Sequence, residues 1–243
     1  MKNEYGLQMY SVRDITKDDL RRALVEVGKL GYKYVEFAGF FDHTAEEVVS
    51  YMKEAGVRIS GTHSPVDDLV PEKLEETIAY HKAIGNKDYI IPSAHLETPE
   101  RIARFAEIVN HAQPILAAEG IQLGFHNHSK EFQTMYWGST IHTELEKRTD
   151  LHFEIDTFWA FNAGLDPIAL LERLGDRVHV IHVKDGFPGG RGMALGEGMA
   201  PVSMVHDYAE KHGIRMVVES ESLQPTGLEE VARCIRYLKK LDA

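Results

Sequence analysis

The chain has 243 residues, of which 43% are hydrophobic and 27% are charged, and this composition predicts a well-cored globular protein. Its 38 acidic residues outnumber 27 Lys and Arg residues, and the net charge of -11 argues against general binding to nucleic acid, whose phosphates need basic partners. The sequence shows no signal peptide or membrane-spanning apolar run, and Cys234 is the only cysteine. We therefore expect a cytoplasmic protein without membrane contact or internal disulfide.

Eight short β-rich segments alternate with longer amphipathic segments from one end of the chain to the other. In chain order, the predicted strands are 5–12, 34–39, 58–63, 88–94, 121–128, 151–156, 178–185 and 215–221. The intervals show helical periodicity, and the segment 44–56 begins with Thr44 as a plausible N-cap. Several predicted helices stop at a glycine just before the next strand: Gly31, Gly56, Gly85, Gly120 and Gly213.

Alternation of strands and helices predicts a parallel sheet covered by helices. Eight repeats in a chain of this length favour a closed (β/α)8 barrel, or TIM barrel, over an open doubly wound sheet. An open sheet would need a glycine-rich turn after the first strand, and MYSVRDITKDD has none. No linker-like stretch interrupts the pattern, so residues 1–243 are expected to form a single α/β domain.

Polar side chains of the kinds that bind metals or substrates collect at the C-terminal ends of the predicted strands, where TIM barrels place their active sites. They are Gln8, Glu36, His63, His126, His128, Glu154, Asp156, His182, Lys184, Glu219 and Glu221. Glu154 and Asp156 share one face of their strand, as do Glu219 and Glu221. Alternation alone therefore does not decide which member of each pair belongs to the site. Asp185 lies on the opposite strand face from His182 and Lys184, so we expect it to cap a loop. Carboxylates and imidazoles crowded at one mouth predict a divalent cation: manganese, cobalt, zinc or magnesium.

Six motifs carry a resemblance to a known family: GLQMYSVRD, HNHSKEF, FEIDTFWAFNAGLDP, HVIHVKDG, LGEG and VVESE. In their order and spacing they resemble the xylose isomerase-like TIM barrel family of sugar phosphate isomerases and epimerases. The resemblance implies one divalent ion, manganese first, held by Asp156, His182 and Glu219. The family usually has a glutamate at the position of His126, so the fourth ligand is either His126 or Glu131, and charge balance slightly favours Glu131. The resemblance also implies a possible homo-oligomer.

The resemblance implies an isomerase or epimerase that acts on a ketose or keto-sugar. Glu219 would remove the proton next to a carbonyl to give an enediolate, and Glu131 or a histidine would serve as the second acid or base. Lys184 and His128 would stabilise the oxyanion or carry protons. Members with histidine-rich strand 5 segments include a dehydratase acting on a keto-inositol and lyases acting on 3-keto sugars, and these enzymes share the first step.

Gln8, His63, His128, Trp159 and Arg191 are the candidate substrate contacts. Trp159 is equally suited to stacking on a sugar ring and to packing in the core. Arg191 lies in the glycine-rich loop 185–198, which we expect to be mobile, and there it either reaches an anionic substrate group or points into water.

Two readings of other classes stay open from the sequence. Endonuclease IV shares the superfamily, but it needs three metals and a grip on phosphates. A non-catalytic barrel that binds a sugar or cyclitol would keep the pocket without turnover.

Overall fold

The structure, a computed structural model, describes residues 3–243. Within this range eight parallel strands close into a barrel in the order β1-β10-β7-β6-β5-β4-β3-β2, which confirms the predicted α/β TIM barrel. The barrel strands are β1 (Gly6–Gln8), β2 (Tyr34–Phe37), β3 (Arg58–His63), β4 (Asp88–Ile91), β5 (Gln122–His126), β6 (His152–Asp156), β7 (Val180–Val183) and β10 (Arg215–Val218). Each lies within one of the eight predicted segments.

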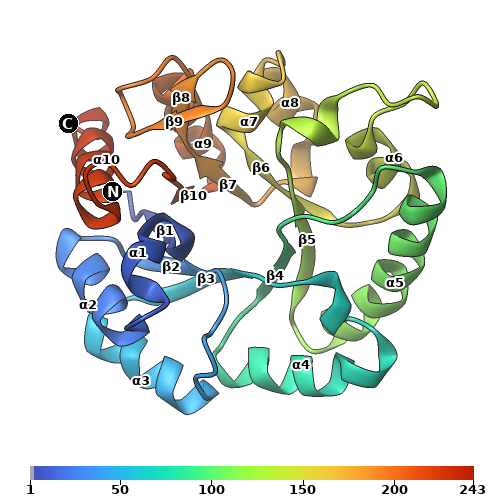
Figure 1. Ribbon diagram of the computed structural model, residues 1–243, viewed down its shortest axis with the longest axis horizontal. Coiled ribbons are helices and arrows are strands. Elements are labelled where there is room, and N and C mark those ends of the chain that lie inside the picture. Colours follow the sequence, from blue (N-terminus) through green and yellow to red (C-terminus); the bar gives the residue numbers. More distant parts are fainter. Residues whose placement is uncertain (1–2) are drawn as a thin grey trace.

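Helices surround the barrel (Figure 1). Their bounds are α1 (Arg13–Thr16), α2 (Leu20–Leu30), α3 (Ala45–Ala55), α4 (Pro71–Ala83), α5 (Pro99–Ala118), α6 (Ile141–Arg148), α7 (Thr157–Asn162), α8 (Pro167–Leu174), α9 (Val202–His212) and α10 (Gly227–Leu241). Short 3-10 turns follow four elements: η1 (Met9–Val12), η2 (Val66–Asp68), η3 (Ser129–Phe132) and η4 (Gly175–Arg177). The N-terminal segment lies beside α10, where Asn3 Nδ2 donates to Asp242 Oδ1 at 2.8 Å.

The capping residues predicted from the sequence lie at the starts and ends of these helices. Thr44 caps α3 through a hydrogen bond from the backbone of Glu47, whose side chain bonds back to the backbone of Thr44. All five predicted stop glycines have positive φ, from 65° at Gly56 to 105° at Gly31. A β-carbon would strain the chain there, which is why glycine ends these helices so reliably.

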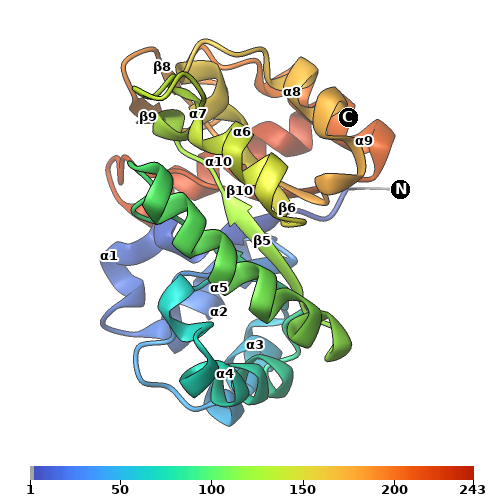
Figure 2. The same ribbon diagram turned by 90° about the vertical axis from the view of Figure 1, so that its right-hand side faces the viewer.

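The interior of the barrel holds a small apolar cluster between a polar N-terminal end, where Arg215 bonds Asp88, and a polar C-terminal end. Ile90, Val180 and Val217 form a small cluster separate from the main core, which fills the space between strands and helices. Val180 is paired with Glu154, and Asp156 with His182, so the next levels of the interior are polar. Figure 2 places α1 and the β8–β9 hairpin, which follow strand ends, on the same side of the barrel.

The glycine-rich segment after β7 forms an antiparallel hairpin, β8 (Asp185–Phe187) with β9 (Arg191–Met193), where a mobile loop was expected. The physical reason is Asp185, whose buried carboxylate accepts hydrogen bonds from the backbone amides of Gly186, Gly196, Gly198 and Ala200 at 2.7–3.0 Å. This confirms that Asp185 caps the loop.

Replacing Asp185 with Ala should loosen residues 186–200 without unfolding the barrel, because it leaves four backbone donors without their acceptor. We expect the amides of Gly196, Gly198 and Ala200 to exchange with deuterium at least about tenfold faster, since about 1.4 kcal/mol corresponds to a factor of ten. Exchange in α2 serves as the internal control. Unchanged protection at the three amides would show that the hairpin holds itself together.

Candidate active site

Four side chains converge at the C-terminal end of the barrel. His126 ends β5, Asp156 ends β6, His182 lies in β7 and Glu219 follows β10. Each offers one ligand atom, these atoms lie within 4.8 Å of one another, and all four residues are buried. We call this group the upper cluster.

Three atoms of the upper cluster are buried without any hydrogen-bond partner in the described chain: His126 Nε2, Asp156 Oδ2 and His182 Nδ1. A buried polar atom without a partner costs about 1–3 kcal/mol, so three of them facing one another indicate a missing shared partner. Two imidazole nitrogens and two carboxylates suit a divalent zinc-, cobalt- or manganese-type ion and would balance its charge. The donor set therefore fits the metal that the sequence predicts.

Neighbouring groups orient the β5 and β6 ligands. His126 Nδ1 faces the carbonyl oxygen of Pro92 at 3.4 Å, which can only accept, so the ring presents the lone pair of Nε2 to the cluster. Burial and the nearby imidazoles of His182 and His63 hold the pKa of His126 well below its ordinary value, so the ring is neutral. Asp156 Oδ1 accepts from the backbone of Trp159 at 2.8 Å and caps α7, which turns Oδ2 toward the cluster.

The three residues of the HNH segment, 126–128, make different contacts. His126 points into the barrel. Asn127 spans from β5 to β6, accepting from the Asp156 backbone nitrogen at 3.1 Å and donating to the Asp156 carbonyl at 3.3 Å. His128 lines the cavity above, where burial and His126 lower its pKa to about 4.

Lys184 is the buried cation of the site. Its Nζ lies 3.2 Å from Glu219 Oε2 and 3.9 Å from Asp156 Oδ2, and it also bonds Glu221. Burial acts to lower the pKa of Lys184, but the carboxylates of Glu219 and Asp156 outweigh it and raise that pKa. Burial conversely acts to raise the pKa of Glu219, but Lys184 and His182 hold it well below its usual range. Lys184 thus stays an ammonium and Glu219 a carboxylate.

Replacing Lys184 with Met should destabilise the metal-free protein by about 3 kcal/mol, because carboxylates are then left buried without their cation. Urea unfolding in the presence of chelator measures this cost. The matched control is Lys130→Met. The Lys130 side chain is 47% exposed, and its closest carboxylate contact is a long one, 3.7 Å from Nζ to Glu131 Oε1. We expect that control to stay within about 0.5 kcal/mol of wild type. Equal losses in both variants would refute the assigned role of Lys184.

A cavity of about 490 Å³ opens above the upper cluster, a volume typical of small-molecule sites. It lies at the C-terminal ends of the strands, and its lining combines a few apolar side chains with titratable groups. These residues are Tyr10, Ala38, Gly39, His63, Pro92, Ser93, His126, His128, Glu219 and Glu221. Of the expected substrate contacts, the structure therefore brings His63 and His128 to the cavity.

Glu131, which charge balance slightly favoured as the fourth ligand, lies outside the upper cluster in the part of the chain that the structure describes. It sits in η3, and its Oε2 accepts from the backbone nitrogen of His128 at 2.8 Å. The chain after β5 turns Glu131 back onto its own backbone, while His126 points at Asp156. The geometry thus favours His126 over Glu131 as ligand.

Three other predicted substrate contacts are absent from the cavity lining in residues 3–243. Gln8 is fully buried, donates to Glu36 Oε2 at 2.7 Å and accepts from the Tyr10 backbone at 2.9 Å. The ring of Trp159 packs 4.6 Å from Lys184 Nζ. Arg191 is exposed, with its guanidinium 4.6 Å from the ring of Phe187.

A second polar level, not resolved by sequence reasoning, lies directly below the upper cluster. Glu36, His63 and Glu154 face the barrel axis here, and His63 Nε2 is 2.7 Å from Glu154 Oε2 and 3.3 Å from Glu36 Oε2. Burial and the Glu36 carboxylate raise the pKa of Glu154 to about 8. The imidazoles of His63 and His182 outweigh burial and lower the pKa of Glu36 to about 2.

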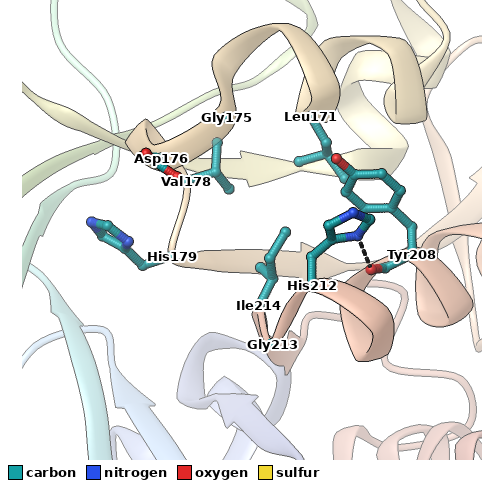
Figure 3. A pocket seen from close by; sticks show the side chains of 9 residues that line it. All are labelled: Leu171, Gly175, Asp176, Val178, His179, Tyr208, His212, Gly213 and Ile214. Carbon is teal, nitrogen blue, oxygen red and sulfur yellow. Dashed lines mark hydrogen bonds between the residues drawn. The ribbon is translucent and has the colours of Figure 1, made fainter.

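Another cavity, of about 430 Å³, lies at the opposite end of the barrel (Figure 3). Val178 and His179 precede β7, and Ile214 precedes β10, so this hollow opens at the N-terminal strand ends. His212 and Tyr208 line this cavity, and Nδ1 of His212 hydrogen bonds the Tyr208 carbonyl oxygen at 2.8 Å. TIM barrels place catalysis at the other end, and this cavity is not the candidate site.

The fold and the upper cluster define a TIM barrel with a set of residues that could hold a metal ion at its C-terminal mouth. The chain belongs to the xylose isomerase-like TIM barrel family, whose family model matches residues 24–241. No curated protein matches the chain at a significant level. Across residues 3–243, none of the helices combines the length and apolarity needed to cross a membrane.

Solved structures of the same fold cover almost the whole chain. A sugar phosphate isomerase/epimerase from Parabacteroides distasonis is 27% identical, with a TM-score of 0.84 over 98% of each chain. A second structure with the same description and organism is 25% identical, with a TM-score of 0.84 over 98% of this chain and 96% of its own. An AP endonuclease, family 2, from Brucella melitensis is 13% identical, with a TM-score of 0.78 over 97% and 99%, and it shows the shared fold alone.

Proposed function

We propose that this protein is a divalent-metal-dependent isomerase or epimerase that acts on a ketose or keto-sugar by removing the proton next to the carbonyl. The observation that carries the proposal is the upper cluster: unpartnered ligand atoms buried at the floor of a sugar-sized cavity. The similarity to two structures described as sugar phosphate isomerases/epimerases supports the substrate class. Manganese is the first expectation for the ion, with cobalt, zinc or magnesium as alternatives.

His126, Asp156, His182 and Glu219 would hold the ion, which when bound supplies Lewis-acid polarisation of a substrate carbonyl. Glu219 also lines the cavity and is ionised, so it is the group placed to accept the carbon-bound proton. Lys184 stays charged 3.2 Å from Glu219, and its positive charge favours the negative charge that develops on an enediolate.

Epimerisation needs a second acid or base that approaches the substrate from another side. His128 meets this need, because it follows β5 and lines the cavity, whereas Glu219 follows β10 across the barrel. In this proposal Glu131, which bonds the backbone of His128, positions that residue and does not contact the substrate.

The second candidate function is a dehydratase or lyase acting on a keto-inositol or a 3-keto sugar. The observation that favours it is Glu221, which lines the cavity beside Glu219. Burial and the Glu219 carboxylate raise the pKa of Glu221, so it is suited to donate a proton to a departing oxygen. The enolate formed by Glu219 would then expel that oxygen instead of regaining a proton.

Incubation of the metal-loaded protein with ketoses, 3-keto sugars and keto-inositols in deuterated water tests the proposal. Deuterium at the carbon next to the carbonyl, together with an epimer or isomer, is the expected result by NMR. An unsaturated ketone would instead establish the lyase. Binding of these compounds with neither exchange nor product would refute catalysis and leave a sugar-binding barrel.

A further inference from the structure

His182 lies between the two polar levels of the barrel interior. Its Nε2 is 2.7 Å from Glu36 Oε2 and 3.2 Å from Glu154 Oε2. Its Nδ1 faces the other way, 3.5 Å from Glu219 Oε2, with no hydrogen-bond partner among residues 3–243. One ring thus joins a carboxylate below to the upper cluster above.

A second set of donors in this interior is also compact enough to hold a cation: His63, His126, Glu154 and His182. The facing atoms of its lower members are already hydrogen bonded, however, with His63 Nε2 at 2.7 Å from Glu154 Oε2. The upper cluster instead presents three unpartnered atoms. Because His63 and Glu154 are paired with each other, the lower set is the weaker candidate for a metal centre, although Glu154 Oε1 also has no partner in the described residues.

We propose that Glu36 is a positioning residue that fixes both the ring orientation and the tautomer of His182. Glu36 Oε2 accepts from Gln8 Nε2 at 2.7 Å, and an oxygen that acts as an acceptor there also accepts from His182, so His182 Nε2 carries the hydrogen of its own 2.7 Å bond. In the neutral form that binds a metal, the ring then has its lone pair on Nδ1, directed at the space shared with Asp156 and Glu219. Carboxylates that hold a metal-binding imidazole in this way set its basicity as well as its direction.

Glu36 is itself held in one geometry. Gln8 Oε1 is occupied by the Tyr10 backbone N–H at 2.9 Å, so the amide of Gln8 must direct its Nε2 at Glu36 Oε2, at 2.7 Å. Glu36 is fully buried, and β2 does not pair with β7, so this contact reaches across the barrel interior. The role of Gln8 is then to orient Glu36.

Zinc affinity measured by chelator competition tests the proposal, which rests on the metal centre of the proposed function but needs no substrate. Glu36→Gln keeps the size of the side chain and removes its charge, and we expect zinc to bind 10–100-fold more weakly. The matched control is Glu154→Gln, the same change at the same level, because Glu154 Oε2 makes its short bond to His63 and lies farther from His182 Nε2, at 3.2 Å, than Glu36 Oε2 does. Its affinity should stay within a few-fold of wild type.

Nitrogen NMR of labelled histidines reads the tautomer directly, with His182 assigned by comparison with His182→Gln. Zinc-loaded wild type should carry the hydrogen on Nε2, and Glu36→Gln should show a mixture of tautomers or ring states. A bare Nε2 in wild type would overturn the proposal even if Glu36→Gln failed to fold. Equal weakening in both variants, or no zinc binding by wild type, would also overturn it. Zinc bound with the expected tautomer but no turnover would refute only the proposed enzyme.

Discussion

Replacing Asp156 with Asn is expected to abolish stoichiometric binding of a divalent ion while the barrel stays folded. The amide can still accept from the backbone of Trp159 and cap α7, so the local fold is kept. It replaces the charged oxygen, Oδ2, that faces the site without a partner in the described residues. Elemental analysis after dialysis should find about one ion per wild-type chain and almost none in the variant.

A matched pair of variants in the same experiment decides whether His126 or Glu131 is the fourth ligand. His126→Gln should lose the ion, because Nε2 of His126 lies 3.7 Å from Asp156 Oδ2 within the upper cluster. Glu131→Gln should keep it, since Glu131 serves the backbone of His128. The reverse outcome would restore Glu131 as the ligand. Full metal content in the Asp156 variant would show that the upper cluster is not the binding site.

The fold was predictable because its signals are local and repeated. The glycines at five helix ends have a positive φ that favours glycine, and Thr44 satisfies a backbone donor that any helix start leaves open. Asp185 was identified as a loop cap from its phase along β7 alone, and the structure gives it four amide partners. Such features depend on a few neighbouring residues.

The inner polar level was not predictable, because alternation gives the parity of a strand but not how deep each residue lies. Glu154 and Asp156 share one face of β6, and both proved to point inward, at different levels. Deciding between them needs the stagger of all eight strands, which is a property of the closed barrel. Glu36 was visible as a carboxylate at the end of β2, but its contact with His182 joins residues 146 positions apart.

The slight preference for Glu131 over His126 as the fourth ligand arose for a similar reason. A third carboxylate looked favourable for a dication as long as the turn after β5 was unknown. The 3-10 turn η3 places the Glu131 carboxylate against the amide of His128, and this local bond takes the side chain away from the centre. The two carboxylates of the upper cluster, Asp156 and Glu219, would already balance a divalent ion.

Replacing Glu219 with Gln should lower deuterium exchange into a keto-sugar by about 100- to 10,000-fold, the contribution of a well-placed general base. The effect follows from its position: it lines the cavity, is ionised, and is held by Lys184 at 3.2 Å. The amide oxygen can still face the metal, so ion content is measured alongside to separate a lost base from a lost ligand.

Glu221→Gln is the control that also distinguishes the two candidate reactions. Glu221 lines the same cavity and bonds the same lysine, but it lies outside the upper cluster in the described chain. For an epimerase, exchange in this variant should remain close to wild type. For a lyase, exchange should persist while elimination falls, since the proton donor to the leaving oxygen is removed. Full exchange in Glu219→Gln with metal bound would rule out Glu219 as the base, and the search would move to His128.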